Sequence, residues 1–172
     1  MHIDTGLFDH MVLQRTNRNV SAAAFSGTCQ TRGPVRVSVR REGRPLKGFA
    51  DRPVGQAARG RFRGVLRGLP VGGPYEITLR LGEESRVFAD VLVGDVWLAA
   101  GQSNMQGGAH RRPRFKAPDL TRAFFMDDRW GPAHEPLHNM WAVVDEIHNQ
   151  LNNGRPPAPN PRDEWLGVSP AI

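Results

Sequence analysis

Ser103 is the residue of this chain whose setting best fits covalent chemistry. It lies in Gly101-Gln102-Ser103-Asn104-Met105, directly after a nearly continuous apolar run from Val91 to Ala100. Such a run predicts a strand that is buried on both faces, as in a parallel sheet. A serine on the tight turn after such a strand is typical of a hydrolase nucleophile. The alternative is that Ser103 only caps the next helix, because serine is a common N-cap residue.

The neighbours of Ser103 could support either the turn or the reaction. Gly101 allows the backbone to turn sharply. The backbone N–H of Ser103 would donate to the oxyanion of an acyl-transfer intermediate. Gln102 and Asn104 carry amides that either contribute to this site or simply tie the turn together, and both interpretations stay open.

A serine nucleophile needs a base and an acid that orients the base. Asp145-Glu146-Ile147-His148 spells Asp-x-x-His, and residues i and i+3 share one face of a helix. Asp145 and His148 could therefore act on Ser103. They would serve equally well as the polar border of an amphipathic helix, and we favour this second interpretation.

A metal site is the other chemistry that the sequence could suggest. His134 and His138 are four residues apart, and Asp127 and Asp128 precede them. Pro136 interrupts the spacing, and nothing fixes a coordination geometry. We expect these residues to lie in surface loops, and we expect neither a metal nor an organic cofactor.

Residues 1–90 predict an all-β sandwich. Five stretches alternate or are rich in β-forming residues: Val20–Phe25, Val35–Arg40, Arg61–Leu66, Tyr75–Leu81 and Arg86–Val91. Turn signals such as Gly72-Gly73-Pro74 separate them. Val35, Val37 and Val39 alternate with polar residues, which predicts one buried and one solvated face.

Residues 91–172 predict the start of an α/β domain. After the apolar run, Ala123–Met126 predicts a second short buried strand, and Pro136–Leu151 predicts a helix. The apolar residues of that helix fall on one face: Leu137, Met140, Trp141, Val144, Ile147 and Leu151. One or two strands and one helix cannot bury themselves, so we expect this domain to be incomplete in the chain.

The composition narrows the function further. The formal charge is +6, from 21 arginines and 2 lysines against 17 acidic residues. Because aromatic residues do not alternate with the basic ones, we favour a solvated basic surface over a nucleic-acid partner. The single cysteine, Cys29, excludes an internal disulfide and a cysteine-based zinc site. The sequence shows no signal peptide and no membrane-spanning run, so no membrane partner is expected and the localisation stays open.

Several segments together resemble a known family. Gly94–Met105, which contains the GQSNM motif, resembles the first block of the SGNH hydrolases in the form found in sialate O-acetylesterase-like carbohydrate esterases. Leu7–Arg15 and Leu69–Tyr75 resemble two stretches of the β-sandwich that precedes the catalytic domain there. Met126–Trp130 and Glu135–Trp141 resemble a segment of related bacterial esterases. Leu7–Arg15, Leu69–Tyr75 and Gly94–Met105 also stand in the order and spacing found in that family.

This resemblance implies a fold and an activity. The fold would be an N-terminal all-β sandwich (residues 1–90) followed by the first part of an SGNH, flavodoxin-like α/β hydrolase domain (91–172). The activity would be removal of acetyl groups from acetylated carbohydrate, such as O-acetylated sialic acid or xylan, with Ser103 as nucleophile and no cofactor. The family's later blocks, which supply oxyanion donors and an Asp-x-x-His, are not identifiable here. We therefore expect a chain that is inactive by itself, as a fragment, a frameshift product or half of a split enzyme.

The alternative function is a non-catalytic carbohydrate-binding or interaction module. The sandwich would then be the working part, although it offers few aromatic residues for a sugar to stack on. The sequence leaves open which acetylated sugar is bound and what the oligomeric state is.

Overall fold

The computed structural model describes residues 1–101, 116–135, 137 and 142–151. The chain divides into two compact units, Met1–Val96 and Trp97–Ile172. We call them the N-terminal unit and the C-terminal unit. Ser103, Gln102 and Asn104 lie outside the described residues.

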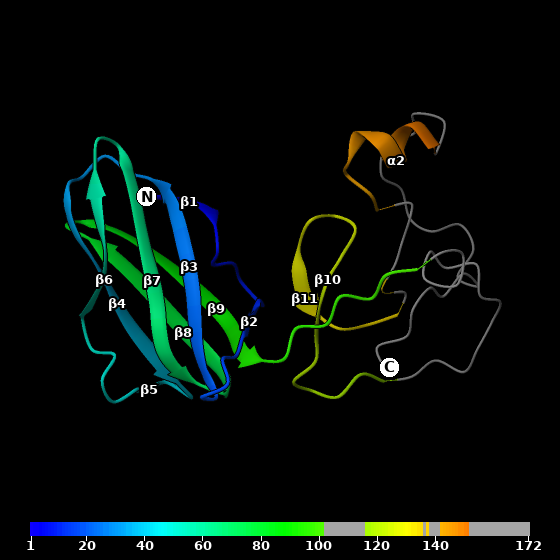
Figure 1. Cartoon of the computed structure of the whole chain (residues 1–172), viewed down its shortest axis with the longest axis horizontal. Coiled ribbons are helices and arrows are strands. Elements are labelled where there is room, and N and C mark those ends of the chain that lie inside the picture. The colour runs from blue at the N-terminus through cyan, green and yellow to red at the C-terminus, as the bar shows by residue number, and fades with distance from the viewer. Residues whose placement is uncertain (102–115, 136, 138–141, 152–172) are drawn as a thin grey trace. The chain divides into compact units, whose positions relative to one another are not determined.

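The N-terminal unit is a single curled β-sheet of nine strands. The strands are β1 (His2–Thr5), β2 (Val12–Gln14), β3 (Val20–Thr28), β4 (Gly33–Arg41), β5 (Arg44–Pro45), β6 (Arg52–Ala58), β7 (Arg61–Pro70), β8 (Gly72–Leu81) and β9 (Glu84–Gly94). Their order in the sheet is β1-β3-β7-β6-β4-β8-β9-β2, with β5 paired to β4. Figure 1 shows β3 and β7 crossing over β8 and β9, so the two halves of the sheet face each other as in a sandwich.

Strand pairing is antiparallel except at the last strand, where β2 pairs with β9 in parallel. An isolated antiparallel bridge, Arg15↔Ser21, joins the end of β2 to β3. The last strand in the order, β2, thus lies next to β3, the second strand in the order, and the sheet curls back on itself. Ser21, the single buried polar residue of the described chain, donates from its hydroxyl to the carbonyl of Leu66 at 3.0 Å.

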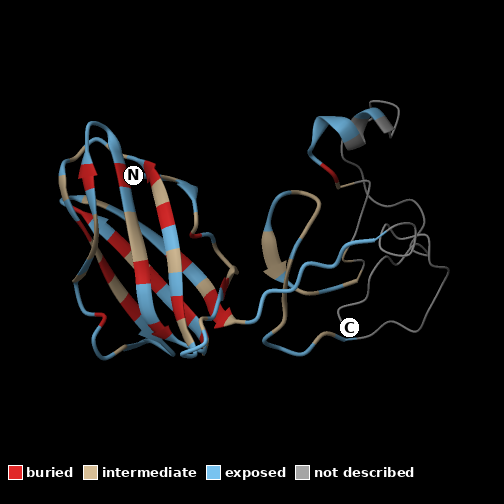
Figure 2. Cartoon of the chain, in the orientation of Figure 1, coloured by how far each residue is buried: buried red, intermediate tan, exposed pale blue. Residues whose placement is uncertain are grey.

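The core lies between the two halves of this sheet, as the buried bands in Figure 2 show. Val35, Val37 and Val39 are at most 1% exposed, while Arg36 and Ser38 between them are half-buried. The alternation predicted from the sequence is therefore confirmed. Large side chains of the core come from six segments: Leu7, Leu13, Phe25, Phe62, Leu66, Tyr75, Ile77, Leu79 and Phe88.

The tight turns follow from local residue chemistry. β4 and β5 are joined by Glu42 and Gly43, whose φ angles are 51° and 73°. Two consecutive positive φ angles define the type I′ turn, which matches the twist of a hairpin. The β6–β7 hairpin repeats the pattern with Arg59 and Gly60, at φ 53° and 77°.

All five strands predicted for residues 1–90 are present, but the sequence missed β1, β2, β5 and β6. β6 contains Pro53 and Gly55, which are depleted in strands. It forms because β4 and β7 pair with it on both sides. Its existence depends on partners distant in the sequence, which no local pattern reveals.

The apolar run from Val91 to Ala100 does not form one buried strand, so that prediction is wrong. Val91 and Val93 are buried in β9, which ends at Gly94. Val96, Trp97 and Leu98 are 44%, 87% and 92% exposed. β2 pairs with β9 only as far as Gly94, and no described strand pairs beyond it. The residues from Val91 to Gly94 thus lie within the sheet of the N-terminal unit.

The described part of the C-terminal unit holds a short hairpin and a short helix. β10 (Arg122–Phe124) pairs with β11 (Trp130–Pro132), and α2 spans Glu146–Leu151. The strand predicted at Ala123–Met126 exists in part but is not buried, because Phe124 is 54% exposed. In the helix predicted over Pro136–Leu151, residues 142–145 are not helical; residues 136 and 138–141 lie outside the described part.

No parallel strand pair occurs in the described part of the C-terminal unit, so the α/β domain stays a prediction. Among its described hydrophobic residues only Val143 is fully buried. The described part of the chain also contains no helix that is long and apolar enough to cross a membrane.

Candidate active site

The backbone that leads from β9 toward Ser103 is held at its start by β2. The Arg15 guanidinium donates two hydrogen bonds to the Asp95 carboxylate, from Nε at 2.8 Å and from Nη2 at 3.1 Å. The Gln14 side-chain carbonyl accepts from the Val96 backbone N–H at 2.7 Å, and the Arg15 N–H donates to Gly94 O at 2.8 Å. These contacts clamp the exit of the strand. Asp95 therefore anchors the backbone that follows β9 to the residues at the end of β2.

The clamp is electrostatic as well as geometric. The hydrogen bond from Arg15, followed by the charge of its guanidinium, lowers the pKa of Asp95. The same bond raises the pKa of Arg15. A bidentate arginine–carboxylate pair fixes direction as well as distance. Its partners are well exposed, so its contribution is to orientation more than to stability.

Gly101 is the last described residue before the predicted nucleophile, and it is exposed and outside any strand or helix. Ser103, Gln102 and Asn104, where a turn was predicted, lie in the segment 102–115 that the structure does not describe. Their roles as nucleophile and turn support thus stay predictions.

The predicted acid–base pair is only partly described. Asp145 is exposed and lies directly before α2, not within it. His148 is in α2, but its side chain is not described. Because Asp145 is outside the helix, the argument that residues i and i+3 share one helical face does not hold for this pair. Their role stays a prediction.

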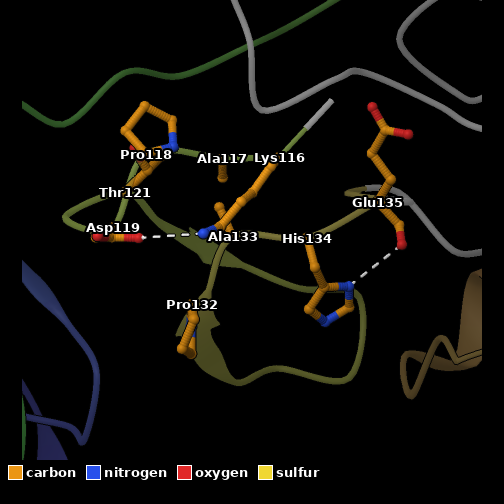
Figure 3. Close-up of a pocket in the computed structure, with 9 residues that line it drawn as sticks. All are labelled: Lys116, Ala117, Pro118, Asp119, Thr121, Pro132, Ala133, His134 and Glu135. Carbon is orange, nitrogen blue, oxygen red and sulfur yellow. Dashed lines mark hydrogen bonds and ion pairs between the residues drawn. The ribbon is translucent and has the colours of Figure 1, made fainter. Parts of the chain in front are cut away.

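A hollow of about 330 Å³ lies within the C-terminal unit (Figure 3). It is lined by residues of two neighbouring segments: Lys116, Ala117, Pro118, Asp119, Thr121, Pro132, Ala133, His134 and Glu135. The backbone N–H of Ala133 donates to Thr121 O at 3.0 Å, which ties the segments together. The polar groups in the lining are an ammonium, a hydroxyl, an imidazole and two carboxylates.

His134 is held at the rim by a ring contact and a hydrogen bond. Its imidazole stacks on the Phe125 ring with centroids 4.5 Å apart and an interplanar angle of 21°. Its Nδ1 lies 3.4 Å from the carbonyl oxygen of Glu135, as the dashed line in Figure 3 marks. Lys116 and Asp119 form an ion pair at 3.9 Å, but both are over 90% exposed, so this pair is weak.

The described residues considered for a metal site, Asp127, Asp128 and His134, form no metal-binding cluster with other described residues. Across the described residues, no three histidine, cysteine or carboxylate side chains cluster closely enough to hold an ion. Asp128 occupies a turn with φ 59° and donates its backbone N–H to Phe125 O at 3.1 Å. His134 stacks on Phe125, and His138 lies outside the described part.

One histidine–carboxylate pair was missed by sequence reasoning. His10 Nδ1 lies 2.7 Å from Asp90 Oδ2, in the N-terminal unit. The His10 N–H donates to Ala89 O, and the Ala89 N–H donates to the Asp9 carboxylate. Both His10 and Asp90 have positive φ angles, 61° and 55°. The contacts lock the segment before β2 onto a bulge of β9; the segment's resemblance to the family was the available signal.

Comparison with known proteins finds a matching family for the second part of the chain. Residues 93–170 match the family of carbohydrate esterases described as sialic acid-specific acetylesterases. The matched segment contains Gly101–Met105 and the hollow of Figure 3. The resemblance to sialate O-acetylesterase-like carbohydrate esterases that the motifs predicted is therefore confirmed.

Among solved structures, the chain is similar to a carbohydrate acetylesterase from Xanthomonas citri, with 30% sequence identity and a TM-score of 0.39. The match covers 61% of this chain and 22% of that protein, so the chain spans less than a quarter of its length. No curated protein matches the chain.

Proposed function

We propose that this chain is part of a serine carbohydrate O-acetylesterase in which Ser103 is the nucleophile. The observation that carries the proposal is that Gly101–Met105 lies inside the segment matching the esterase family. The clamp of Asp95 and Val96 by Gln14 and Arg15 adds support, because it fixes the start of the segment that leads to Ser103.

The reaction follows from serine chemistry. The hydroxyl oxygen of Ser103 would attack the acetyl carbonyl carbon and pass its proton to a base. The oxyanion would be stabilised by backbone N–H groups, including that of Ser103. The sugar oxygen would leave with a proton, and water would then release acetate from the acetyl-enzyme. This route requires neither a metal nor an organic cofactor.

The substrate we propose is an acetylated carbohydrate, such as O-acetylated sialic acid or acetylated xylan. The hollow lined by Lys116, Thr121 and His134 offers donors and acceptors of the kind that bind sugar hydroxyls. We propose that it takes part in sugar binding by the esterase.

The first test measures acetate release from these substrates by the chain, by Ser103→Ala and by Ser85→Ala. Ser85 is an exposed serine on β9 and serves as the matched control. Asp145 and His148 form the single Asp-x-x-His of the sequence, and from the sequence we favour them as the polar border of a helix over an acid and base. Without an effective base, a serine nucleophile loses several orders of magnitude in rate. We therefore expect the 172-residue chain by itself to release acetate far below an enzymatic rate. An enzymatic rate that Asp145→Asn and His148→Gln each abolish would show that this pair is the acid and base after all.

A second measurement tests the nucleophile even when turnover is slow. After reaction with 4-nitrophenyl acetate, mass spectrometry of the digested chain should find the acetyl group on the peptide that contains Ser103. Ser103→Ala should lose this adduct and Ser85→Ala should keep it. Acetylation that is equal in all three proteins would overturn the assignment of Ser103.

A further inference from the structure

One outer face of the N-terminal unit carries a row of arginines. Arg61, Arg63 and Arg67 lie on β7 and are exposed, while Phe62 and Leu66 between them are buried. Side chains alternate across a strand, so the three arginines point to the side opposite the core. Arg61 and Arg63 are about 7 Å apart along the strand, and Arg67 is about 13 Å further, from the rise of a β-strand.

The flanking strands place hydroxyl and amide side chains beside this row. β7 lies between β3 and β6 (Figure 1). On β3, Thr28 is opposite Arg61 and Ser26 is opposite Arg63. On β6, Gln56 is opposite Arg63. Residues directly opposite each other share one face of a sheet. We call Arg61, Arg63, Arg67, Ser26, Thr28 and Gln56 the basic face.

The charge of the basic face is not compensated within the described chain. Some other arginines of the unit are paired: Arg36 and Arg80 with Asp51, Arg15 with Asp95, and Arg86 with Asp9. Arg61, Arg63 and Arg67 take part in no ion pair among the described residues. Residues 1–96 hold 15 basic and 9 acidic residues, and 15 − 9 gives the whole formal charge of +6. The rest of the sequence is neutral in sum.

We propose that the basic face docks an acidic glycan, a polysaccharide that carries carboxylate groups. A guanidinium binds a carboxylate through two parallel hydrogen bonds, which favours arginine over lysine for this ligand. The hydroxyls of Ser26 and Thr28 and the amide of Gln56 can bind sugar hydroxyls between the carboxylates. A row about 20 Å long along one strand suits an extended polymer more than a small molecule.

The described basic face lacks the aromatic rings on which a single-stranded nucleic acid stacks its bases. The outward residues of β3 and β7 beside the arginines are Ala22, Ala24 and Val65, so the described face offers no aromatic ring on which a base could stack. The binding of an acidic glycan requires no turnover. Only the further step, that this polymer carries the acetyl groups removed by the esterase, rests on the proposed function.

The experiment measures binding of the full chain to an oligogalacturonate by calorimetry at about 0.15 M salt, where distant charges are screened. Arg61→Gln, Arg63→Gln and Arg67→Gln are combined in one variant. The matched control combines Arg18→Gln, Arg32→Gln and Arg44→Gln, three exposed arginines of the same unit that make no ion pair within the described residues. Both variants lose the same charge, and unchanged unfolding midpoints verify that both fold.

We expect the basic-face variant to bind the oligogalacturonate about tenfold or more weakly, because it loses three charge-assisted contacts to carboxylates. The control should change by less than about threefold. A third variant with lysine at the three positions keeps the charge and should still lose affinity, because the fork is lost. Equal losses of affinity in the glutamine variant and in the control would show that only the net charge matters, and this would overturn the proposal.

Three comparisons test the nature of the partner. A neutral xylan oligosaccharide of equal length should bind much more weakly than the oligogalacturonate. Tighter binding to single-stranded DNA or to phosphatidylserine vesicles, lost in the basic-face variant, would assign the face to that partner and overturn the glycan. No binding of the oligogalacturonate by the unmodified chain would overturn it as well. Ser103→Ala should bind normally, so a failure of the proposed catalysis is separable from a failure of the docking proposal.

Discussion

Phe62 and Phe25 make a reciprocal cross-strand arrangement that should dominate the stability of the N-terminal unit. In the register of β3 and β7, Phe62 is opposite Gly27 and Phe25 is opposite Gly64. A Cβ atom added to Gly27 would lie 2.5 Å from Phe62 Cζ, and one added to Gly64 would lie 2.4 Å from Phe25 Cζ. Each ring therefore covers the glycine opposite it, and each glycine makes the space for a ring.

The cost of Phe62→Ala can be worked from this packing. Phe62 is 2% exposed, and a buried phenylalanine truncated to alanine costs about 3–5 kcal/mol. The upper part of the range is expected, because Gly27 has no side chain that could fill the cavity. The two rings also lie 6.3 Å apart at 51°, a tilted pair worth about 0.5–1.5 kcal/mol beyond its buried area.

The assay is denaturant unfolding of the full chain, followed by circular dichroism because this signal does not depend on tryptophan fluorescence. Val87→Ala is the control, because Val87 lies in the same sheet but is 47% exposed and should change stability by less than about 0.5 kcal/mol. The double variant with Phe25→Ala should show a coupling free energy of about 1 kcal/mol. A loss below about 1.5 kcal/mol for Phe62→Ala would refute the inference that these rings fill the core.

Two further predictions concern charge and the clamp. The pKa of Asp51 is lowered by the hydrogen bond from Arg80, and then by the charges of Arg80 and Arg36. A carboxyl whose folded pKa is depressed contributes stability above its unfolded pKa of about 3.9, and this is lost as the pH falls through the folded pKa. Unfolding midpoints at pH 6 and pH 3 should therefore differ less in Asp51→Asn than in the unmodified chain; an equal difference would contradict the assignment. For the clamp, Gln14→Ala removes the acceptor of the Val96 N–H at 2.7 Å, so hydrogen exchange of that amide should accelerate. Leu92, whose N–H donates to Met11 O, serves as the internal reference and should not change.

The sequence predicted those strands whose signal is local. Val35, Val37 and Val39 alternate with polar residues over a stretch long enough to be recognised, and the structure buries all three. The turn between β4 and β5 also has a local signal, because Gly43 adopts its φ of 73° at no steric cost. β6 was missed because its stability comes from β4 and β7, which pair with it from other parts of the chain.

The candidate site, too, has one part that the sequence revealed and one part that it did not. The motif around Ser103 was recognisable because the identity and order of a few residues carry it. The contacts that hold the approach to it were not recognisable, because each joins residues about 80 positions apart. Arg15–Asp95, Gln14–Val96 and His10–Asp90 are all of this kind. No pattern within a window of 10 or 20 residues can indicate such a pair.

The apolar run after β9 shows what a local pattern does and does not determine. Burial of an apolar segment lowers the free energy of the folded chain, but the apolar residues do not determine which other part of the chain covers the segment. Val91 to Val93 are buried because β2 and β8 lie beside them in the sheet. Val96, Trp97 and Leu98 have equally apolar side chains, but no described strand pairs with them, and they are exposed. The predicted buried strand was therefore too long. The prediction used only the apolar residues of the segment, whereas burial also requires neighbouring strands that pair with it.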